Sequence, residues 1–308
     1  MTRSIVLDQW QAPEGGRRFP GPAFLTQTYG RLPPTALMLL AILSVQLGSA
    51  LATMLFSSLG PIGTAFCSLG LSATMLSFVV RPTLDRTMLA RLPLILLFGL
   101  VAAAMELPFF LALQTVPLGI AATITFLGPL GLAIAMSRRP IHFLWVGVAT
   151  LGIALMTPEI GGGLDPVGLG FAAISAIAWA SYVPVSKRAG AVFDGNTGLV
   201  LGLWAATFLL MPLALAEGTV LQASPREILG ALGVALLSAM LPMAMEFKAL
   251  QRLSARAYGI LMTLEPAIAA LVGAIFLGQI IGPALLAAIA CVTVAAVGVT
   301  LSDRRDAG

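Results

Sequence analysis

Long apolar segments dominate this sequence, and they constrain the fold more than any other feature. Apolar residues make up 58% of the 308 residues and charged residues only 10%, whereas a soluble domain has about 25% charged residues. A helix needs about 20 mostly apolar residues to cross a bilayer. The sequence therefore predicts an all-α integral membrane protein with ten transmembrane helices. The expected spans are residues 35–56, 61–80, 92–113, 117–137, 141–157, 166–186, 196–216, 228–250, 254–278 and 281–301.

Basic residues predict how the chain is oriented. With a cytoplasmic N-terminus and alternating spans, 16 of the 17 Lys and Arg residues fall on the inner side, and only Arg226 falls outside. Inner loops of membrane proteins carry such an excess of Lys and Arg. We therefore expect both termini in the cytoplasm, with residues 1–34 as a disordered tail and 302–308 as a short one. The outer loops carry acids instead: Glu159, Asp165, Glu217 and Glu227.

The two halves of the chain contain a repeat. Residues 110–129 (FLALQTVPLGIAATITFLGP) align without a gap on residues 247–266 (FKALQRLSARAYGILMTLEP), and 6 of the 20 positions are identical. The offset predicts two five-helix repeats, 35–157 and 166–301. Because five is odd, the second repeat enters the membrane inverted. Inverted repeats are common in secondary transporters, whose substrate site lies at the repeat interface near the midplane.

Three glutamates fall inside predicted spans: Glu106, Glu246 and Glu265. A charge at the bilayer centre costs on the order of 2.5–3.5 kcal/mol on insertion scales, so such residues usually face a protein interior or a cavity. We expect them to bind a substrate ammonium or to carry a proton. The alternative is a structural hydrogen bond made by a protonated acid. Glu246 has a further alternative, an ion pair with Lys248 or Arg252 near the cytoplasmic end.

Prolines stand at matching points of the two repeats. Pro266 follows Glu265 and leaves the carbonyl of Met262 without its helical donor, and Pro129 does the same for Thr125. Gly128 lies directly before Pro129. We predict helix breaks at Gly128, Pro129 and Pro266 that expose polar backbone to a cavity, which is where the membrane tolerates it. A simple packing kink is the alternative.

Polar and aromatic side chains recur at helical spacing on several spans, and we expect these stripes to face inward. Hydrogen bonds between helices are the alternative for Ser and Thr. Trp179 and Tyr182 have large rings that can line a pocket and attract a cation. Spans 141–157 and 281–301 lack such stripes and should be peripheral. The stripes contain Ser175, Trp179, Tyr182 and Ser186; Gln46, Ser49, Thr53 and Ser57; Thr64, Ser68 and Ser72; and Tyr258, Met262 and Glu265.

Several stretches of the chain resemble a known family. They are LALQTVPLGIAA, GPLGLAIAMSRRP, FLWVGVATLGIAL, AWASYVPVSKRAGA and LPMAMEFKALQRLSARAYGILMTLEPAIAALVGAIFLG. Over about residues 35–301 the sequence resembles the EamA-type drug/metabolite transporter superfamily, and within it the threonine/homoserine exporters of bacterial inner membranes. The resemblance implies ten helices in two inverted repeats, a central cavity, and export of small amino acids by alternating access.

The chain also departs from that family's pattern. Ser68 stands where relatives often have a basic residue, Thr125 where they often have an acid, and Gln279 where the usual FLGE ends in Glu. Glu106 occupies a place that is often neutral. Aromatic amino acids therefore remain open as substrates beside threonine and homoserine. The expected substrate-binding residues are Glu265, Glu246, Glu106, Trp179, Tyr182, Gln46, Tyr258, Ser68 and Thr125.

Other function classes fit the sequence less well. The chain has one histidine, His142, and no HExxH or GxSxG motif, so we expect neither a metal, a cofactor nor an enzyme. A multidrug or sugar-nucleotide transporter on the same fold is the main alternative, and an intramembrane enzyme the remote one. We expect an amino acid substrate, contact with membrane lipid, no nucleic acid partner, and a monomer.

Overall fold

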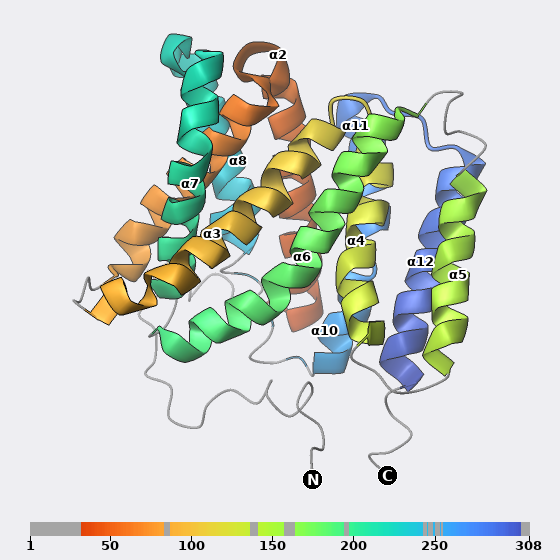
Figure 1. Ribbon diagram of the computed structural model, residues 1–308. Coiled ribbons are helices and arrows are strands. Elements are labelled where there is room, and N and C mark those ends of the chain that lie inside the picture. Colours follow the sequence, from red (N-terminus) through yellow and green to blue (C-terminus); the bar gives the residue numbers. More distant parts are fainter. Residues whose placement is uncertain are drawn as a thin grey trace.

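The computed structural model describes residues 32–82, 87–135, 141–156, 164–193, 197–242 and 255–302, and the single positions 245, 249 and 253. Within these ranges the chain is helical and forms no β-strand, as the apolar segments predict (Figure 1). The expected N-terminal tail lies almost wholly outside the described residues. In chain order the elements are α2 (Pro34–Val80), α3 (Thr87–Ala112), α4 (Leu118–Ala135), α5 (Ile141–Met156), α6 (Pro166–Val192), α7 (Thr197–Glu217), η4 (Val220–Gln222), α8 (Pro225–Ala235), η5 (Leu236–Met240), α10 (Ala255–Met262), α11 (Glu265–Leu277) and α12 (Pro283–Ser302).

Several of these helices have the length and the apolar composition of membrane spans. By length and apolar composition, five stretches in the described part of the chain qualify as spans: Pro34–Val80, Arg91–Ala112, Pro166–Val192, Thr197–Glu217 and Ile260–Leu277. Shorter apolar helices cover Leu118–Leu132, Phe143–Gly152 and Pro283–Gly298. The fold is therefore all-helical and apolar enough for a membrane. The division into ten spans and the internal repeat stay predictions.

Helix α2 is bent into two arms at Gly60. The backbone there has φ 67° and ψ 167°, which are not helical. Glycine adopts a positive φ without steric penalty, and the next residue, Pro61, has no N–H to donate back into the helix. The arms correspond to the predicted spans 35–56 and 61–80, and they meet at the upper end of Figure 1.

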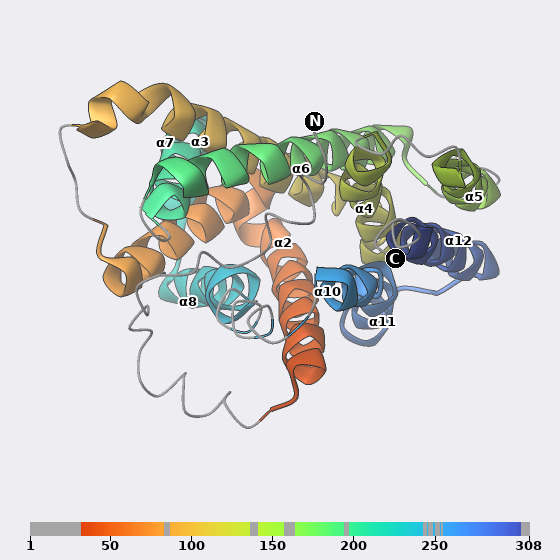
Figure 2. The ribbon, with the colours of Figure 1, turned by 90° about the horizontal axis from the view of Figure 1, so that it is seen from below.

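The helices surround α2, which packs against α3, α7, α8 and α11. Helix α3 crosses α6 and α7, and α4 packs between α6 and α11. Helices α5 and α12 pack against each other at one edge of the molecule (Figures 1 and 2). These are the two helices whose lack of polar side chains predicted a peripheral position.

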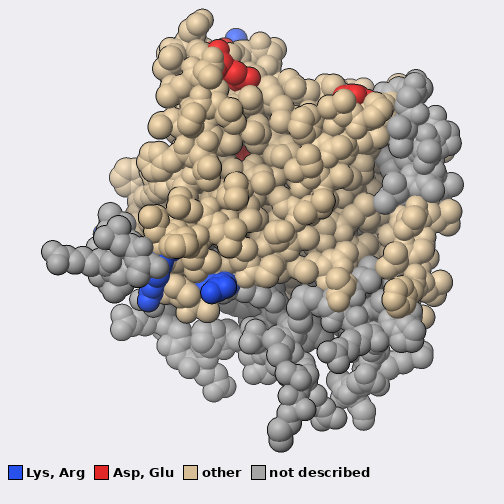
Figure 3. Space-filling view, in the orientation of Figure 1, with Lys and Arg blue, Asp and Glu red and all other residues tan. Residues whose placement is uncertain are grey.

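Charged side chains gather at the two ends of the molecule. Figure 3 shows acidic atoms and one basic residue along the upper edge, basic atoms at the lower left, and a broad neutral band between them. We call the upper end, with Asp165, Glu217 and Glu227, the acidic end. The lower end, with Arg81, Arg91 and Arg188, is the basic end. This distribution is the one that a membrane-spanning protein requires.

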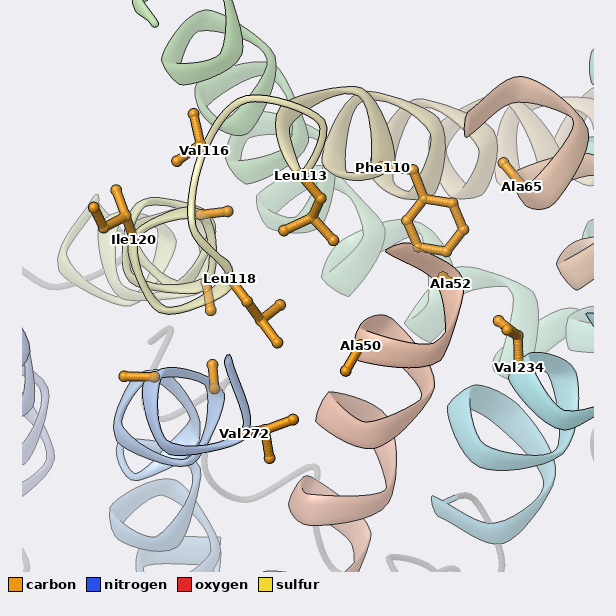
Figure 4. Packing of buried hydrophobic residues seen from close by; sticks show 14 of the residues in the cluster. Ala50, Ala52, Ala65, Phe110, Leu113, Val116, Leu118, Ile120, Val234 and Val272 are labelled. Carbon is orange, nitrogen blue, oxygen red and sulfur yellow. The ribbon is translucent and has the colours of Figure 1, made fainter. Parts of the chain in front are cut away.

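The apolar core is continuous near the acidic end and divided near the basic end. One large cluster joins the bend of α2 to the adjoining parts of α3, α4, α8, α11 and α12, with Phe110, Val116, Leu118, Val234 and Val272 among its members (Figure 4). Toward the basic end, three smaller clusters replace it. They centre on α4 with α5 and α12, on the first turns of α2, and on α3 with α6 and α7.

Candidate functional site

The helical segment around Glu265 is interrupted just before this residue. Helix α10 ends at Met262 and α11 begins at Glu265, with Thr263 and Leu264 in a turn between them. The turn closes through short backbone bonds, in which the N–H of Thr263 donates to the carbonyl of Ile260 over 3.2 Å. Thr293 on α12 donates its hydroxyl to the carbonyl of Thr263 over 3.2 Å. Pro266, next to the turn, cannot donate to the carbonyl of Met262.

This interruption places Glu265 at the start of a helix. The residue lies in the first turn of α11, where the helix dipole and the unpaired backbone N–H groups favour a negative charge. Gln46, on the first arm of α2, donates from its Nε2 to Oε1 of Glu265 over 3.3 Å. The side chain of Gln46 is only 2% exposed. Two residues singled out from separate patterns therefore meet inside the fold.

Gln46 keeps one acceptor free. Its Oε1 atom is buried and has no hydrogen-bond partner among the described residues. A buried polar atom without a partner is uncommon in folded proteins and needs an explanation. Because the carboxylate of Glu265 can only accept, the amide nitrogen faces Glu265 and the amide oxygen is left for another donor. The pair thus offers acceptors to a ligand rich in N–H groups.

Aromatic side chains pack in the clusters that Met262, at the end of α10, also joins. Trp179 on α6 meets the ring of Phe126 on α4 edge to face, with ring centroids 6.3 Å apart. Trp179 and Met262 pack against the same apolar cluster, and Met262 packs with Tyr258 against a second one. The α6 aromatic and the end of α10 therefore flank one region. Tyr182 lies elsewhere, with its ring 5.2 Å from that of Phe98 on α3.

A second buried carboxyl lies on α3. The Ser68 hydroxyl, on the second arm of α2, forms a hydrogen bond with the carboxyl of Glu106. The Oε1 atom of Glu106 is buried and has no hydrogen-bond partner among the described residues. The sequence predicted both residues in one substrate site with Glu265, and the structure pairs Ser68 and Glu106 with each other.

The expected break in the first repeat is not present. Helix α4 runs without interruption from Leu118 to Ala135, with Pro129 inside it. Gly128 has a packing role instead, because a Cβ there would overlap the backbone of Ala176 on α6. This close contact between α4 and α6 leaves no space for a side chain at the position that aligns with Glu265. Thr125, in the same helix, donates to the carbonyl of Ala121 over 2.8 Å, within its own helix.

Ser175, from the polar stripe of α6, forms a bond between helices. It is fully buried and donates its hydroxyl to the carbonyl of Met105 on α3 over 2.7 Å. This is the interhelical hydrogen bond that was the alternative for the polar stripes. Glu246 lies outside the described residues. No group of three or more His, Cys, Asp or Glu side chains able to hold a metal occurs in the described part of the chain.

The sequence analysis did not foresee a set of bonds that ties the acidic end together. Gln279, after α11, accepts from the backbone N–H of Leu118 at the start of α4 over 2.9 Å. Thr219, after α7, donates to the carbonyl of Leu59 beside the bend of α2 over 2.8 Å. Thr115 donates to the carboxylate of Asp165, which caps α6. The departure from FLGE at Gln279 was the one available signal of this network.

Hydrogen bonds also shift the pKa values of two acids that lie at helix starts near the acidic end, Asp165 and Glu227. Backbone donation from Val167, helped by the Thr115 hydroxyl, lowers the pKa of Asp165. Backbone donation from Ser224, helped by the hydroxyls of Ser224 and Ser58, lowers the pKa of Glu227. Both acids are therefore charged at neutral pH and hold loops from different parts of the chain together.

The sequence of this chain is similar to those of known transporters. The model of the EamA-like transporter family matches residues 166–301. The threonine/homoserine exporter RhtA of Escherichia coli (strain K12) is 38% identical over 277 residues, which cover 89% of this chain and 93% of that protein. The exporter of the same name from Salmonella typhimurium (strain LT2) is 38% identical over 278 residues, with the same coverage.

One crystal structure of another protein superposes with a TM-score of 0.53 at 18% identity, over 88% of this chain and 98% of that one. At that identity the likeness concerns the fold alone. The family is assigned from the sequence similarity to the exporters, because that similarity extends over nearly the full length of this chain and of each exporter. The chain belongs to the EamA-like transporter family and is similar to its threonine/homoserine exporters.

Proposed function

We propose that this transporter exports small neutral amino acids of the threonine and homoserine kind, and that Glu265 and Gln46 bind the substrate's ammonium group. The observation that carries the proposal is the hydrogen bond between the buried Gln46 and the partly buried Glu265, together with the unpartnered Oε1 of Gln46. An ammonium has three donors. The Glu265 carboxylate, the Gln46 amide oxygen and the carbonyl of Met262 beside Pro266 supply three acceptors.

The local electrostatics support an amine rather than a phosphate. In the described part of the chain, the arginines at positions 81, 91, 188 and 226 are all exposed, and the buried ionisable side chains identified above are carboxyls. A sugar nucleotide carries phosphates, which proteins usually bind with Arg, Lys or helix N-termini. The sugar-nucleotide alternative therefore has no support in this region.

Aromatic amino acids fit the same ammonium site, so side-chain size decides between the two substrate classes. Trp179 and Phe126 pack edge to face in the region that Met262 borders. Two large rings in contact leave little space beside the end of α10. This packing favours a small side chain such as that of threonine, and we place threonine and homoserine before aromatic substrates.

Transport by alternating access fits the distribution of the core. The large apolar cluster and the bonds of Gln279, Thr219 and Asp165 join both halves of the chain near the acidic end. We infer that this conformation is closed at the acidic end and that the substrate enters from the basic end. The positive-inside rule makes the basic end cytoplasmic, which is the direction of entry that an exporter needs.

We further propose the wider organisation that the sequence predicts: ten spans in two inverted repeats in the bacterial inner membrane, with both termini in the cytoplasm and a monomer as the working unit. Fusions of a phosphatase reporter to the C-terminus test the orientation, because the enzyme is active only in the periplasm. Phosphatase activity at the C-terminus would refute the orientation and the inversion of the repeats.

Counterflow in proteoliposomes tests the substrate directly. Vesicles loaded with an unlabelled amino acid are diluted into buffer that contains a trace of labelled threonine. If the protein transports both compounds, labelled threonine accumulates transiently inside the vesicles. We expect threonine and homoserine to drive counterflow, phenylalanine and tryptophan to do so weakly, and sugar nucleotides not at all. If only aromatic amino acids drive counterflow, the substrates are aromatic amino acids and not threonine and homoserine. If no amino acid drives counterflow, the proposal is rejected.

A further inference from the structure

The carboxyl of Glu106 has an unusual environment. Glu106 lies on α3 among small residues, after Ala102, Ala103 and Ala104, and its Oε1 is buried. Its hydrogen bond with Ser68 leaves Oε1 without a partner among the described residues. An acid kept for structure alone would be expected to have both oxygens satisfied, because a buried carbonyl or carboxylate without a donor is destabilising. The residue therefore calls for a role beyond packing.

No charged group compensates Glu106 in the described part of the chain. The helices packed against α3 are α2, α4, α6 and α7, and α4 has no titratable side chain among its described residues. Arg81 and Arg188 are exposed at helix ends, and Tyr182 packs on Phe98, two turns along α3. The other titratable groups among the described side chains of these helices are Cys67, next to Ser68, and Glu217, beside Gly60 at the acidic end.

The two buried carboxyls lie at different depths. At 1.5 Å per residue, Glu265 is about 18 Å along α11 from its end at Leu277, and Gln46 is about 20 Å along α2 from the bend at Gly60. Glu106 is only about 9 Å along α3 from its end at Ala112. These reference points all belong to the acidic end (Figure 1). Glu106 is therefore nearer the acidic end than Glu265 is.

We propose that Glu106, with Ser68, is the proton site of the transporter and is distinct from the substrate site at Glu265 and Gln46. This assignment rests on the proposed export function. In each cycle the Glu106 carboxylate takes one proton from the acidic end and releases it toward the basic end, while one zwitterionic amino acid leaves in the opposite direction. The exchange moves one positive charge inward, so it uses the pH gradient and the membrane potential together.

The environment suits a proton better than a metal cation or an amine. A proton needs only the carboxyl itself, and the neutral acid is the form that a low-dielectric site without a counter-charge favours. A sodium ion would need several further oxygen ligands, whereas the Ser68 hydroxyl is the one hydrogen-bonding partner of Glu106 in the described residues. Ser68 can accept from the protonated acid or donate to the carboxylate, so it accompanies both states.

The test separates exchange from coupled transport. The Glu106→Gln variant keeps the side-chain volume but cannot release a proton. With equal pH on both sides, we expect its rate of threonine counterflow to stay within about twofold of wild type. With a pH gradient, we expect the threonine that it accumulates to fall by roughly tenfold or more. Glu265→Gln should lose both activities. Glu217→Gln, which changes an acid at the acidic end, is the matched control and should keep both.

Each result has one meaning. Gradient-driven accumulation at the wild-type rate in Glu106→Gln would overturn the proton assignment. Loss of counterflow in a well-folded Glu106→Gln protein would also overturn it and place the residue in the substrate site. If the wild-type protein shows no amino acid counterflow, the export function itself fails, and the proton site is then judged by the measurement that follows.

Carbodiimide labelling of the wild-type chain in membranes needs neither a substrate nor a variant. Carbodiimides modify protonated carboxyls in apolar surroundings, and peptide mass spectrometry locates the adduct. We expect an adduct on Glu106 that decreases as the pH is raised, because an ionised carboxylate does not react. Glu217 and Glu227 should remain unmodified. An unmodified Glu106 at every pH tested would contradict a titrating carboxyl at this position.

Discussion

Gln46 and Glu265 are 219 residues apart in the sequence, yet the Nε2 of Gln46 donates to the Oε1 of Glu265 over 3.3 Å. The bond joins the first arm of α2 to the start of α11, two elements from different halves of the chain. The contact therefore links the two halves of the chain inside the fold.

Replacing Gln46 should weaken substrate binding. Gln46→Leu removes both the donor to Glu265 and the free Oε1. A hydrogen bond to a charged group contributes about 1.5–3 kcal/mol, which corresponds to an increase in the KM for threonine of roughly 10- to 100-fold. Ser49→Ala is the control on the same helix, since the Ser49 hydroxyl donates to the carbonyl of Val45 within α2. Counterflow at several threonine concentrations gives both values, and an unchanged KM in Gln46→Leu would remove this residue from the site.

Two glycines on α4 should respond differently to the same substitution. Gly128→Ala puts a methyl group into the backbone of Ala176, whereas a Cβ at Gly131 meets nothing within 4 Å. Overpacking of this kind costs about 1–3 kcal/mol, while alanine in an exposed helical position stabilises slightly. We expect a lower midpoint of thermal unfolding in detergent for Gly128→Ala and an equal or higher one for Gly131→Ala. Equal effects would show that α4 and α6 do not touch at Gly128.

The bond from Leu118 to Gln279 should help to keep the acidic end closed. Gln279→Ala removes the acceptor of the Leu118 N–H, and we expect the conformation open at that end to become more populated. Ala50 lies in the large apolar cluster and is 2% exposed (Figure 4). A cysteine at this position, in a chain whose Cys67 and Cys291 have been replaced, can therefore detect opening of the acidic end.

An impermeant maleimide added from the acidic end should label Ala50→Cys slowly in the chain that keeps Gln279. Labelling should be several-fold faster in the same chain with Gln279→Ala. Leu221→Cys, at a position that is 73% exposed, should label fast in both. If Gln279→Ala leaves the labelling rate of Ala50→Cys unchanged, the Leu118–Gln279 bond is not part of the closure.

Asp165 should stabilise the fold in a pH-dependent way. Its side chain accepts from the N–H groups of Val167 and Gly168, both over 3.1 Å, and these bonds with the Thr115 hydroxyl lower the pKa of Asp165. A lowered folded-state pKa means that this stabilisation is present above the ordinary Asp pKa of about 3.9 and is lost as the pH falls through the folded value.

Asp165→Ala should therefore lower the midpoint of thermal unfolding by a few degrees at neutral pH, and the deficit should shrink below about pH 4. Unfolding followed by circular dichroism in detergent measures both effects. A deficit that is independent of pH would mean that the carboxylate charge contributes nothing at this helix start.

The sequence predicted much of the architecture because the membrane imposes simple rules. Apolar length located the helices, and the absence of polar stripes placed α5 and α12 at the edge. A proline next to an intramembrane glutamate located the interruption at Thr263 and Leu264. These features follow from local composition, which a single sequence displays directly.

The rest depended on contacts between distant segments. Gly128 and Glu265 align in the repeat, but α4 is continuous and packs closely on α6 at Gly128, and no local pattern contains that contact. The pairing of Glu106 with Ser68 likewise depends on how α3 crosses α2. Phe126 was missed as a partner of Trp179 because an apolar ring in an apolar helix gives no signal of its own.

Counterflow by Glu265→Gln tests the central assignment most directly. The substitution keeps the volume of the side chain and its bond partner Gln46 but removes the charge that we assign to the substrate ammonium. In proteoliposomes with equal amounts of inserted protein, we predict loss of nearly all threonine counterflow at every pH tested, with normal thermal unfolding. Counterflow at the wild-type rate would contradict the account, because Glu265 would then be a structural hydrogen-bonding group and the ammonium would bind elsewhere.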